Sequence, residues 1–90
     1  MLKRNKVIIS GRVTGVFLRR FIYDHALRLK LKGYVKNISD KVEAVFEGSE
    51  DSVKQMIEFC KIGNPISRVE SVEVVEEPIK GEKEFKILDS

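Results

Sequence analysis

The chain has 90 residues, of which 42% are hydrophobic and 34% are charged, and its formal net charge at pH 7 is +3. This composition excludes an intrinsically disordered chain and indicates one globular domain, residues 1–90, with a small hydrophobic core. No apolar run approaches the roughly 20 residues that a bilayer span needs, so we expect no membrane partner. The mild positive charge suits a small anionic ligand and does not require nucleic acid.

The single cysteine, Cys60, cannot form an internal disulfide, which is typical of a reducing compartment. The apolar run at residues 7–9 is too short for the core of a signal peptide. We therefore expect a cytoplasmic protein, and we expect it to be a monomer. Lysine and glutamate are abundant and Gln55 is the only glutamine, a bias that is typical of thermophilic proteins.

The first elements are a strand and a helix, separated by a loop that contains glycine. Residues 6–13 alternate between two faces with a period of two, which predicts a strand. Residues 18–31 carry apolar side chains at spacings of three and four, which predicts a helix. Gly33 is expected to end this helix. No Ser, Thr, Asp or Asn lies just before the helix begins, so the usual N-cap residue is missing.

The middle of the chain predicts a hairpin and a second helix. Residues 34–38 and 42–47 have the pattern of two short strands, which a tight turn at 39–41 joins. Ser49 is expected to cap the following helix, whose apolar residues fall on one face. The segment 63–65, with its glycine and proline, is expected to end this helix.

Two more strands are expected near the end of the chain, at 69–75 and 84–88, with a turn at 78–81 between them. The order is therefore strand–helix–strand twice, followed by a short extra strand. Two such units joined by a hairpin make the ferredoxin-like split βαβ sandwich. We therefore predict an α+β fold in which two helices cover one face of an antiparallel sheet.

The loop between the first strand and the first helix, within residues 11–19, suggests an anion site. Successive N–H groups at the start of a helix point into one concavity and bind anions. Gly15 permits an unusual backbone conformation, and Arg19 adds a planar cation that can hold a phosphate with two hydrogen bonds. A bound phosphate would then replace the missing N-cap. The alternative is an ordinary turn with water on these N–H groups, and the pattern alone leaves both interpretations open.

The same loop resembles a signature of the acylphosphatase family. The family pattern G-x-V-Q-G-V-x-F-R corresponds to GRVTGVFLR at residues 11–19, and the block G-W-V-x-N corresponds to GYVKN at 33–37. The family-like V-E-x-x-x-E-G stands as VEAVFEG at 42–48, and the G-P-P and A-R-V segments resemble GNP at 63–65 and SRV at 67–69. The resemblance covers nearly the whole chain, and the first two blocks at this separation are specific when taken together.

The resemblance implies a hydrolase that converts acyl phosphates to a carboxylate and inorganic phosphate without a metal, a cofactor or a covalent intermediate. Arg19 then corresponds to the arginine that holds the phosphoryl group, and Asn37 corresponds to the asparagine that orients the attacking water. The phosphate-binding loop corresponds to the backbone of Thr14, Gly15, Val16, Phe17 and Leu18. The implied partners are a small acyl phosphate and phosphate, and no nucleic acid is implied.

Three departures from the family pattern keep a second function open. Thr14 stands at the glutamine position, Leu18 stands at the phenylalanine position, and the hairpin at 39–41 is one residue shorter than usual. These changes are compatible with a catalytically weakened or non-enzymatic ferredoxin-like domain that binds anions or regulates another process. An RNA-binding module is a third possibility for this fold, and such modules stack bases on aromatic residues of the central strands. The outward positions of the third strand here are instead Glu43, Val45 and Glu47.

The other residues with reactive side chains are interpreted as structural. His25 lies further along the first helix than the loop, and Cys60 falls on the apolar face of the second helix. Arg20 follows Arg19, but adjacent residues of a helix face about 100° apart, so the two are not expected to share one phosphate. No cluster of Cys, His and acidic residues has the spacing of metal ligands.

Overall fold

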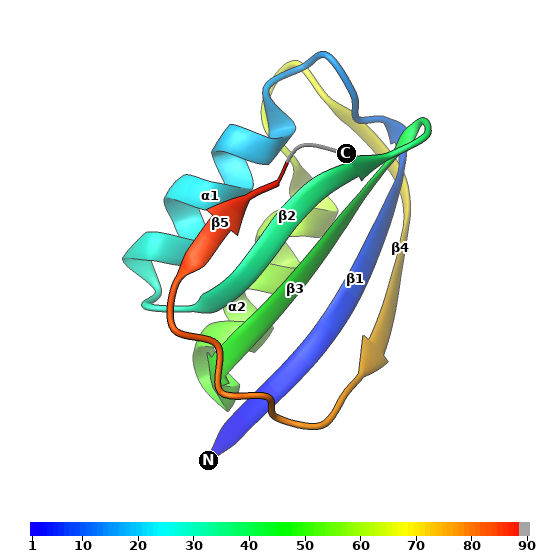
Figure 1. Cartoon of the computed structure of the whole chain (residues 1–90). Coiled ribbons are helices and arrows are strands. Elements are labelled where there is room, and N and C mark those ends of the chain that lie inside the picture. Colours follow the sequence, from blue (N-terminus) through cyan, green and yellow to red (C-terminus); the bar gives the residue numbers. More distant parts are fainter. Residues whose placement is uncertain (89–90) are drawn as a thin grey trace.

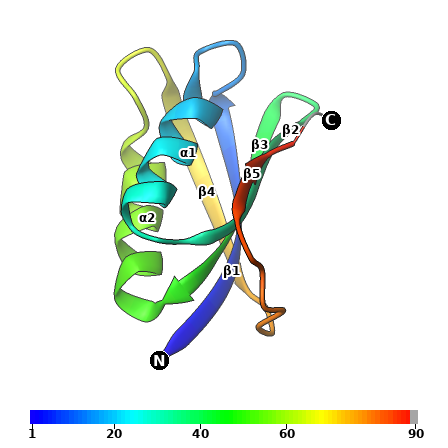
Figure 2. The same cartoon turned by 60° about the vertical axis from the view of Figure 1, so that its left-hand side comes forward.

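Two helices pack against one face of a five-stranded sheet, so the molecule has two layers (Figures 1 and 2). The computed structural model describes residues 1–88, and the last two residues of the expected 1–90 domain lie outside the described part. In chain order the elements are β1 (Leu2–Arg12), α1 (Leu18–Arg28), β2 (Lys32–Ile38), β3 (Lys41–Ser49), α2 (Glu50–Ile62), β4 (Arg68–Glu76) and β5 (Phe85–Ile87). This order and layering confirm the predicted ferredoxin-like α+β class.

The strands are arranged in the order β4-β1-β3-β2-β5. The pairs among the first four strands are antiparallel, as predicted, but β5 lies parallel to β2. The prediction of an entirely antiparallel sheet is therefore wrong at this edge. The cause is the path of the chain, because segment 77–84 crosses from β4 to the opposite edge at the end of the sheet near the N-terminus (Figure 1). As a result, β5 starts beside the beginning of β2 and runs in the same direction.

The hydrophobic core lies between the helices and the sheet. Ile9 of β1 is fully buried, as the period of two predicts for one face of this strand. The apolar face predicted for α2 is confirmed, and its buried residues are Val53, Met56 and Cys60. Ser49 caps α2 by accepting a hydrogen bond of 3.2 Å from the N–H of Ser52, also as predicted. The second helix therefore forms where its local sequence signals place it.

The first helix ends at Arg28, earlier than the predicted end at Leu31. Lys30 takes a left-handed conformation with φ 59°, and the N–H of Leu31 bonds back to the last turn of the helix at 2.9 Å. This ending directs the side chain of Leu31 into the core, where it is buried. The prediction that Gly33 ends this helix is wrong. Gly33 lies in β2 with φ 133°, and a Cβ atom there would stand 1.9 Å from the carbonyl oxygen of Val45.

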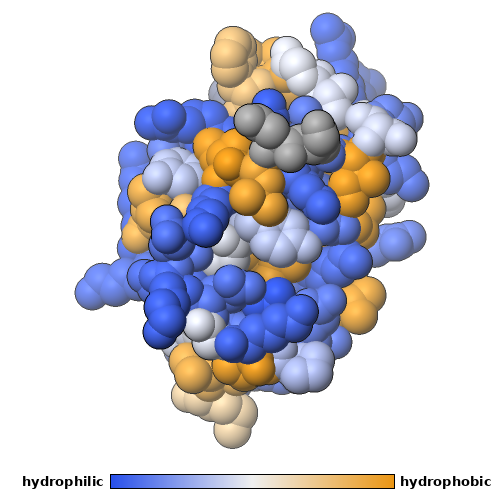
Figure 3. Space-filling model, in the orientation of Figure 1, coloured by the Kyte–Doolittle hydropathy of each residue, from blue (hydrophilic) through white to orange (hydrophobic). Residues whose placement is uncertain are grey.

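The face of the sheet opposite the helices is mainly hydrophilic (Figure 3). Glu43, Val45 and Glu47 of β3 point to this face, but their exposed fractions are only 6%, 1% and 5%. Long side chains from neighbouring strands cover them, since the hydroxyl of Tyr34 donates to Glu43 at 2.7 Å and Lys6 pairs with Glu43 at 3.5 Å. The outward positions of β3 are therefore buried in a polar layer, which the strand pattern alone did not predict.

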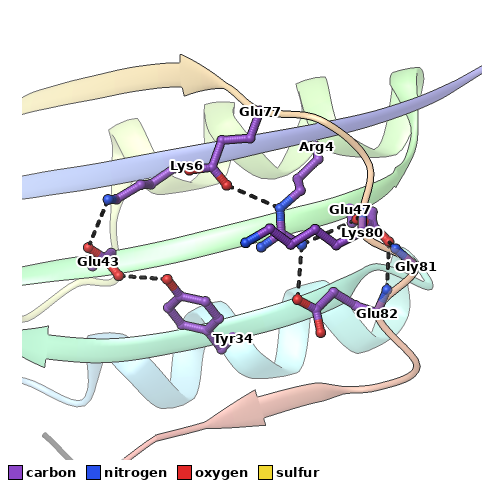
Figure 4. A network of polar contacts seen from close by, with 9 residues as sticks. All are labelled: Arg4, Lys6, Tyr34, Glu43, Glu47, Glu77, Lys80, Gly81 and Glu82. Carbon is purple, nitrogen blue, oxygen red and sulfur yellow. Dashed lines mark hydrogen bonds and ion pairs between the residues drawn. The ribbon is translucent and has the colours of Figure 1, made fainter.

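A network of charged groups fixes segment 77–84 to the sheet (Figure 4). The guanidinium of Arg4 on β1 bonds to Glu47 at 3.2 Å, to Glu77 at 3.1 Å and to Glu82 at 3.0 Å. The carboxylate of Glu47 also accepts hydrogen bonds of 2.8, 3.0 and 2.8 Å from the consecutive N–H groups of 80–82. Because Arg4 and Glu47 are almost fully buried, these bonds are shielded from water and hold the crossing that leads to β5.

Candidate functional site

The connection from β1 to α1, residues 13–17, lies at the end of the sheet away from the N-terminus (Figure 1). Pairing between β1 and β4 shifts register between Ser10 and Gly11, just before this connection. Gly11 has φ 128°, and a Cβ atom there would lie 2.2 Å from the carbonyl oxygen of Arg68, so glycine is required. Val13 and Val16 are buried, and they anchor the loop to the core at two points.

The start of α1 has no side-chain cap. Phe17 occupies the N-cap position with φ 61° and ψ 22°, and no side chain bonds to the first turn there. The first turn of α1 also has no acidic residue, whereas α2 has both a serine cap and two acidic residues in its first turn. The first N–H groups of a helix have no partner within the helix and carry its positive dipole end. The structure therefore agrees with the missing N-cap that the sequence predicted.

Asn64 lies in the connection between α2 and β4, and its side chain bonds to the connection between β1 and α1. Its side-chain amide donates a hydrogen bond of 2.7 Å to the main-chain carbonyl of Val16. The same side chain accepts a bond of 3.1 Å from the N–H of Ser67, and the hydroxyl of Ser67 accepts one of 3.0 Å from the N–H of Asn64. Sequence reasoning missed this residue. The only available signal was an asparagine three residues before a serine, which is typical of a self-bonded turn.

A pocket of about 340 Å³ opens beside the start of α1, and it brings two of the predicted residues together. Arg19 reaches it from the first turn of α1, and Asn37 reaches it from the end of β2. Among residues 1–88 the lining consists of Val13, Gly15, Phe17, Leu18, Arg19, Arg20, Asn37 and Ile87. Five of the seven predicted site residues are thus in the lining, whereas Thr14 and Val16 are not.

Among the described residues, the pocket lining contains two arginines and no aspartate or glutamate. Arg20 is drawn away by Asp24, whose carboxylate accepts a bond of 3.1 Å from it, and its guanidinium lies 5.6 Å from the centre of the Tyr23 ring. Among residues 1–88, Arg19 forms no such ion pair, so its charge is available to a ligand. Sequence reasoning missed Val13, Arg20 and Ile87 as lining residues. The last of these comes from β5, whose place beside β2 was not predicted.

Two of the residues that were interpreted as structural, His25 and Cys60, do not line this pocket, whereas the third, Arg20, does. His25 packs between the rings of Phe21 and Phe59, with both ring centres 4.3 Å from its own, and its Nδ1 lies 3.0 Å from the carbonyl oxygen of Phe21. Cys60 is fully buried, and this burial raises the pKa of its thiol to about 12. Within the described residues, no three His, Cys, Asp or Glu side chains come together as a metal site, and no helix is long and apolar enough to cross a membrane.

Comparison with known proteins agrees with the geometry. The model of the acylphosphatase family matches residues 5–87. An acylphosphatase of Syntrophobacter fumaroxidans is 49% identical over 81 residues, which cover 89% of this chain and 84% of that protein. An acylphosphatase of Pyrobaculum aerophilum is 48% identical over 90 residues, which cover 97% of this chain and 95% of that protein.

A solved structure supports the same relationship. The crystal structure of acylphosphatase from Bacillus subtilis matches this fold with a TM-score of 0.92 and 38% sequence identity. The match covers 98% of this chain and 99% of that one, so all the helices and the sheet are shared and no large segment is left over. Family model, sequence and fold lead to one conclusion: this chain belongs to the acylphosphatase family of hydrolases, as its motifs at 11–19 and 33–37 predicted.

Proposed function

We propose that this chain hydrolyses acyl phosphates through the loop at 14–18, Arg19 and Asn37. The observation that carries the proposal is that the pocket at the uncapped start of α1 holds both Arg19 and Asn37. Arg19 binds the phosphoryl group through its guanidinium fork, and the N–H groups of Gly15, Phe17 and Leu18 contribute donors to the same group. Asn37, near the end of β2, orients the attacking water.

The chemistry follows from the character of the substrate. Water attacks phosphorus, a new P–O bond forms, and the bond between phosphorus and the acyl oxygen breaks to release a carboxylate. The carboxylate is a good leaving group, so the protein's main task is to position the reactants and to stabilise negative charge on the phosphoryl oxygens. The amide oxygen of Asn37 can accept a hydrogen bond from the water but is not a base at neutral pH. The water proton therefore passes to a phosphoryl oxygen of the substrate.

Two of the three departures from the family pattern, Thr14 and Leu18, do not change a polar side chain of the pocket. Leu18, at the phenylalanine position, is a buried residue of the core. Thr14, at the glutamine position, does not line the pocket. No observation in the described part of the chain favours the alternative of a non-catalytic anion-binding or regulatory domain. We therefore propose that the protein is catalytically active, and its rate is to be measured.

The remaining features of the proposal concern the protein's setting. We propose a cytoplasmic monomer that needs no metal or cofactor and does not act on nucleic acid. The composition that led to these expectations supports them, together with a pocket of a size suited to a small molecule. A thermophilic source is supported by the scarcity of glutamine and by relatives from Pyrobaculum species.

The test is hydrolysis of benzoyl phosphate in the presence of EDTA. Wild type, Arg19→Ala and the control Arg28→Ala are compared, since Arg28 is exposed on the same helix and does not line the pocket. We expect turnover in wild type and Arg28→Ala, and its loss in Arg19→Ala with an unchanged circular dichroism spectrum. Full activity in Arg19→Ala would remove Arg19 from the proposed site. Absence of turnover in folded wild type, or its loss with EDTA, would overturn the proposed metal-free reaction.

A further inference from the structure

Phe17 combines an unfavourable backbone conformation with an exposed aromatic side chain. Its φ is 61°, in the left-handed region that bulky residues rarely adopt. Its exposed fraction is 77%, and its side chain is not part of the hydrophobic core. Glycine would take this conformation without strain, and a polar side chain would suit the exposure better. The fold therefore gives no reason for phenylalanine here, and strained residues of this kind cluster at functional sites.

The position of Phe17 relative to the pocket supplies a reason. The side chain lines the same pocket as Arg19 and Asn37, at the point where the loop becomes α1. On the β5 side the pocket is lined by Ile87, a second large apolar side chain with an exposed fraction of 38%. Buried Val13 and Leu18 complete the apolar part of the lining. The pocket thus has a polar part and an apolar part.

The two parts match the two halves of an acyl phosphate. A phosphoryl group needs hydrogen-bond donors and positive charge, which the apolar part does not offer. An acyl group that carries a ring or a branched chain gains by leaving water against apolar side chains. An aromatic ring can also pack on the Phe17 ring in an offset or edge-to-face arrangement. Acetyl has only one methyl group and removes little surface from water.

We propose that Phe17 and Ile87 form a binding site for the acyl group and favour aromatic or bulky apolar acyl phosphates over acetyl phosphate. This inference rests on the proposed function, because the phosphoryl group must bind at Arg19 for the acyl group to reach these residues. It predicts which substrates are preferred, whereas the proposed function predicts only that acyl phosphates are hydrolysed. Contact with the acyl group would then explain why a phenylalanine, and not a glycine, occupies this position.

The test compares kcat/KM for benzoyl phosphate with kcat/KM for acetyl phosphate in wild type, Phe17→Gly, Ile87→Ala and the control Leu27→Ala. Glycine accepts the backbone conformation of Phe17, so Phe17→Gly is expected to fold. Leu27 is an exposed apolar residue of α1 that does not line the pocket. We expect the benzoyl-to-acetyl ratio to fall about three- to tenfold in each pocket variant, mainly through KM for benzoyl phosphate, and to stay constant in the control.

Using a ratio separates acyl recognition from general damage to the loop. If Phe17→Gly loosens the loop without affecting acyl binding, both substrates lose activity equally and the ratio holds, which would overturn the inference. A binding measurement gives an independent readout, since benzoylphosphonate and acetylphosphonate carry a P–C bond that is not hydrolysed. The Kd for benzoylphosphonate should rise about three- to tenfold more than that for acetylphosphonate in Phe17→Gly.

The outcomes also separate this inference from the proposed function. Hydrolysis of both substrates by wild type, with the same ratio in every variant, would leave the proposed function intact and overturn acyl recognition by Phe17 and Ile87. Failure of wild type to hydrolyse either substrate would overturn both. Equal loss of both substrates in Phe17→Gly, with no loss of phosphonate binding, would assign Phe17 to the shape of the loop.

Discussion

The side chain of Asn64 bonds to the main-chain carbonyl of Val16 at 2.7 Å and thereby joins the connection after α2 to the loop between β1 and α1. The two residues are far apart in the sequence, and Val16 lies between Gly15 and Phe17, both of which line the pocket that contains Arg19. Asn64 is itself fixed by reciprocal hydrogen bonds with Ser67, so it offers the loop a rigid support. The shape of the loop is thus determined partly by a residue outside it.

Asn64→Ala should therefore impair the loop more than the fold. Loss of the two hydrogen bonds of this side chain is expected to lower the free energy of unfolding by about 2 kcal/mol. A displaced loop is expected to lower kcat/KM for benzoyl phosphate about tenfold or more, because reacting groups must be held to within about 1 Å. Gln55→Ala, which removes an exposed amide on α2, is the control and should change neither quantity. Wild-type turnover in Asn64→Ala would show that the loop keeps its shape without this bond.

Asn37→Ala should reduce kcat by about two orders of magnitude, by comparison with the loss of other positioned polar groups in enzymes. KM should change little, because the proposed role of Asn37 is to orient water and not to hold the phosphoryl group. The measurement is a Michaelis–Menten analysis with benzoyl phosphate. Asn5→Ala, at the far end of β1, is the matched control. An unchanged kcat with a raised KM would instead make Asn37 a substrate-binding residue.

The carboxyl group of Glu47 makes the free energy of unfolding depend on pH. Burial alone would raise the pKa of its carboxyl group, but the N–H groups of Lys80, Glu82 and Gly81 and the guanidinium of Arg4 outweigh this effect and lower the pKa below its ordinary value of 4.5. A carboxylate with a lowered folded-state pKa stabilises the protein above its unfolded-state pKa. That stabilisation is lost as the pH falls through the folded-state pKa.

Glu47→Gln should accordingly lower the free energy of unfolding by about 3 kcal/mol at pH 7, since it leaves buried Arg4 and three N–H donors without their carboxylate. The difference from wild type should shrink as the pH falls below 4.5, because Glu47 then takes up a proton in the unfolded chain before it does so in the folded protein. Urea unfolding at pH 7, 5 and 3 measures this. Glu58→Gln on the surface of α2 is the control, and a difference that stays constant with pH would contradict the assignment.

Gly33→Ala should be strongly destabilising. A methyl group would meet the carbonyl oxygen of Val45 at 1.9 Å in a residue whose φ is 133°. We expect the free energy of unfolding to fall by about 3 kcal/mol or more, because the two paired strands must separate to admit the methyl group. Gly81→Ala is the matched control, since Gly81 also has a positive φ but no atom within 4 Å, and it should cost about 1 kcal/mol. Equal melting temperatures for the two variants would contradict the argument.

Features that depend on local sequence were predictable, and those that depend on distant contacts were not. The helix α2 was found because Ser49, the apolar spacing and the glycine at its end all act within a few residues of one another. The direction of β5 was not found, because it depends on how segment 77–84 crosses the sheet. The end of α1 was placed too late because the burial of Leu31, and not Gly33, decides where the helix stops.

The candidate site shows the same division. Arg19 and Asn37 could be proposed from the sequence because each belongs to a short motif, and both line one pocket. Ile87 and Asn64 were missed because each reaches the site through a turn or a strand pairing that only the folded chain creates. The conformation of Phe17 could not be predicted from the sequence either. A left-handed phenylalanine is the least expected choice at that position, and sequence propensity argues against it.

The short strand β5 makes one side of the pocket less stable than the rest of the sheet. It has only three residues, it lies at the edge of the sheet, and its flanks are held by the bonds from Gly33 to Glu84 and from Leu88 to Val35, both of 2.9 Å. Edge segments with few bonds open at lower free energy than the centre of a sheet. The side of the pocket that β5 forms can therefore unfold locally while the rest of the molecule stays folded. The buried cluster around Arg4 binds Glu77 and Glu82 in the segment that leads into β5, so we expect substitutions in that cluster to make β5 open more readily, although its residues do not line the pocket.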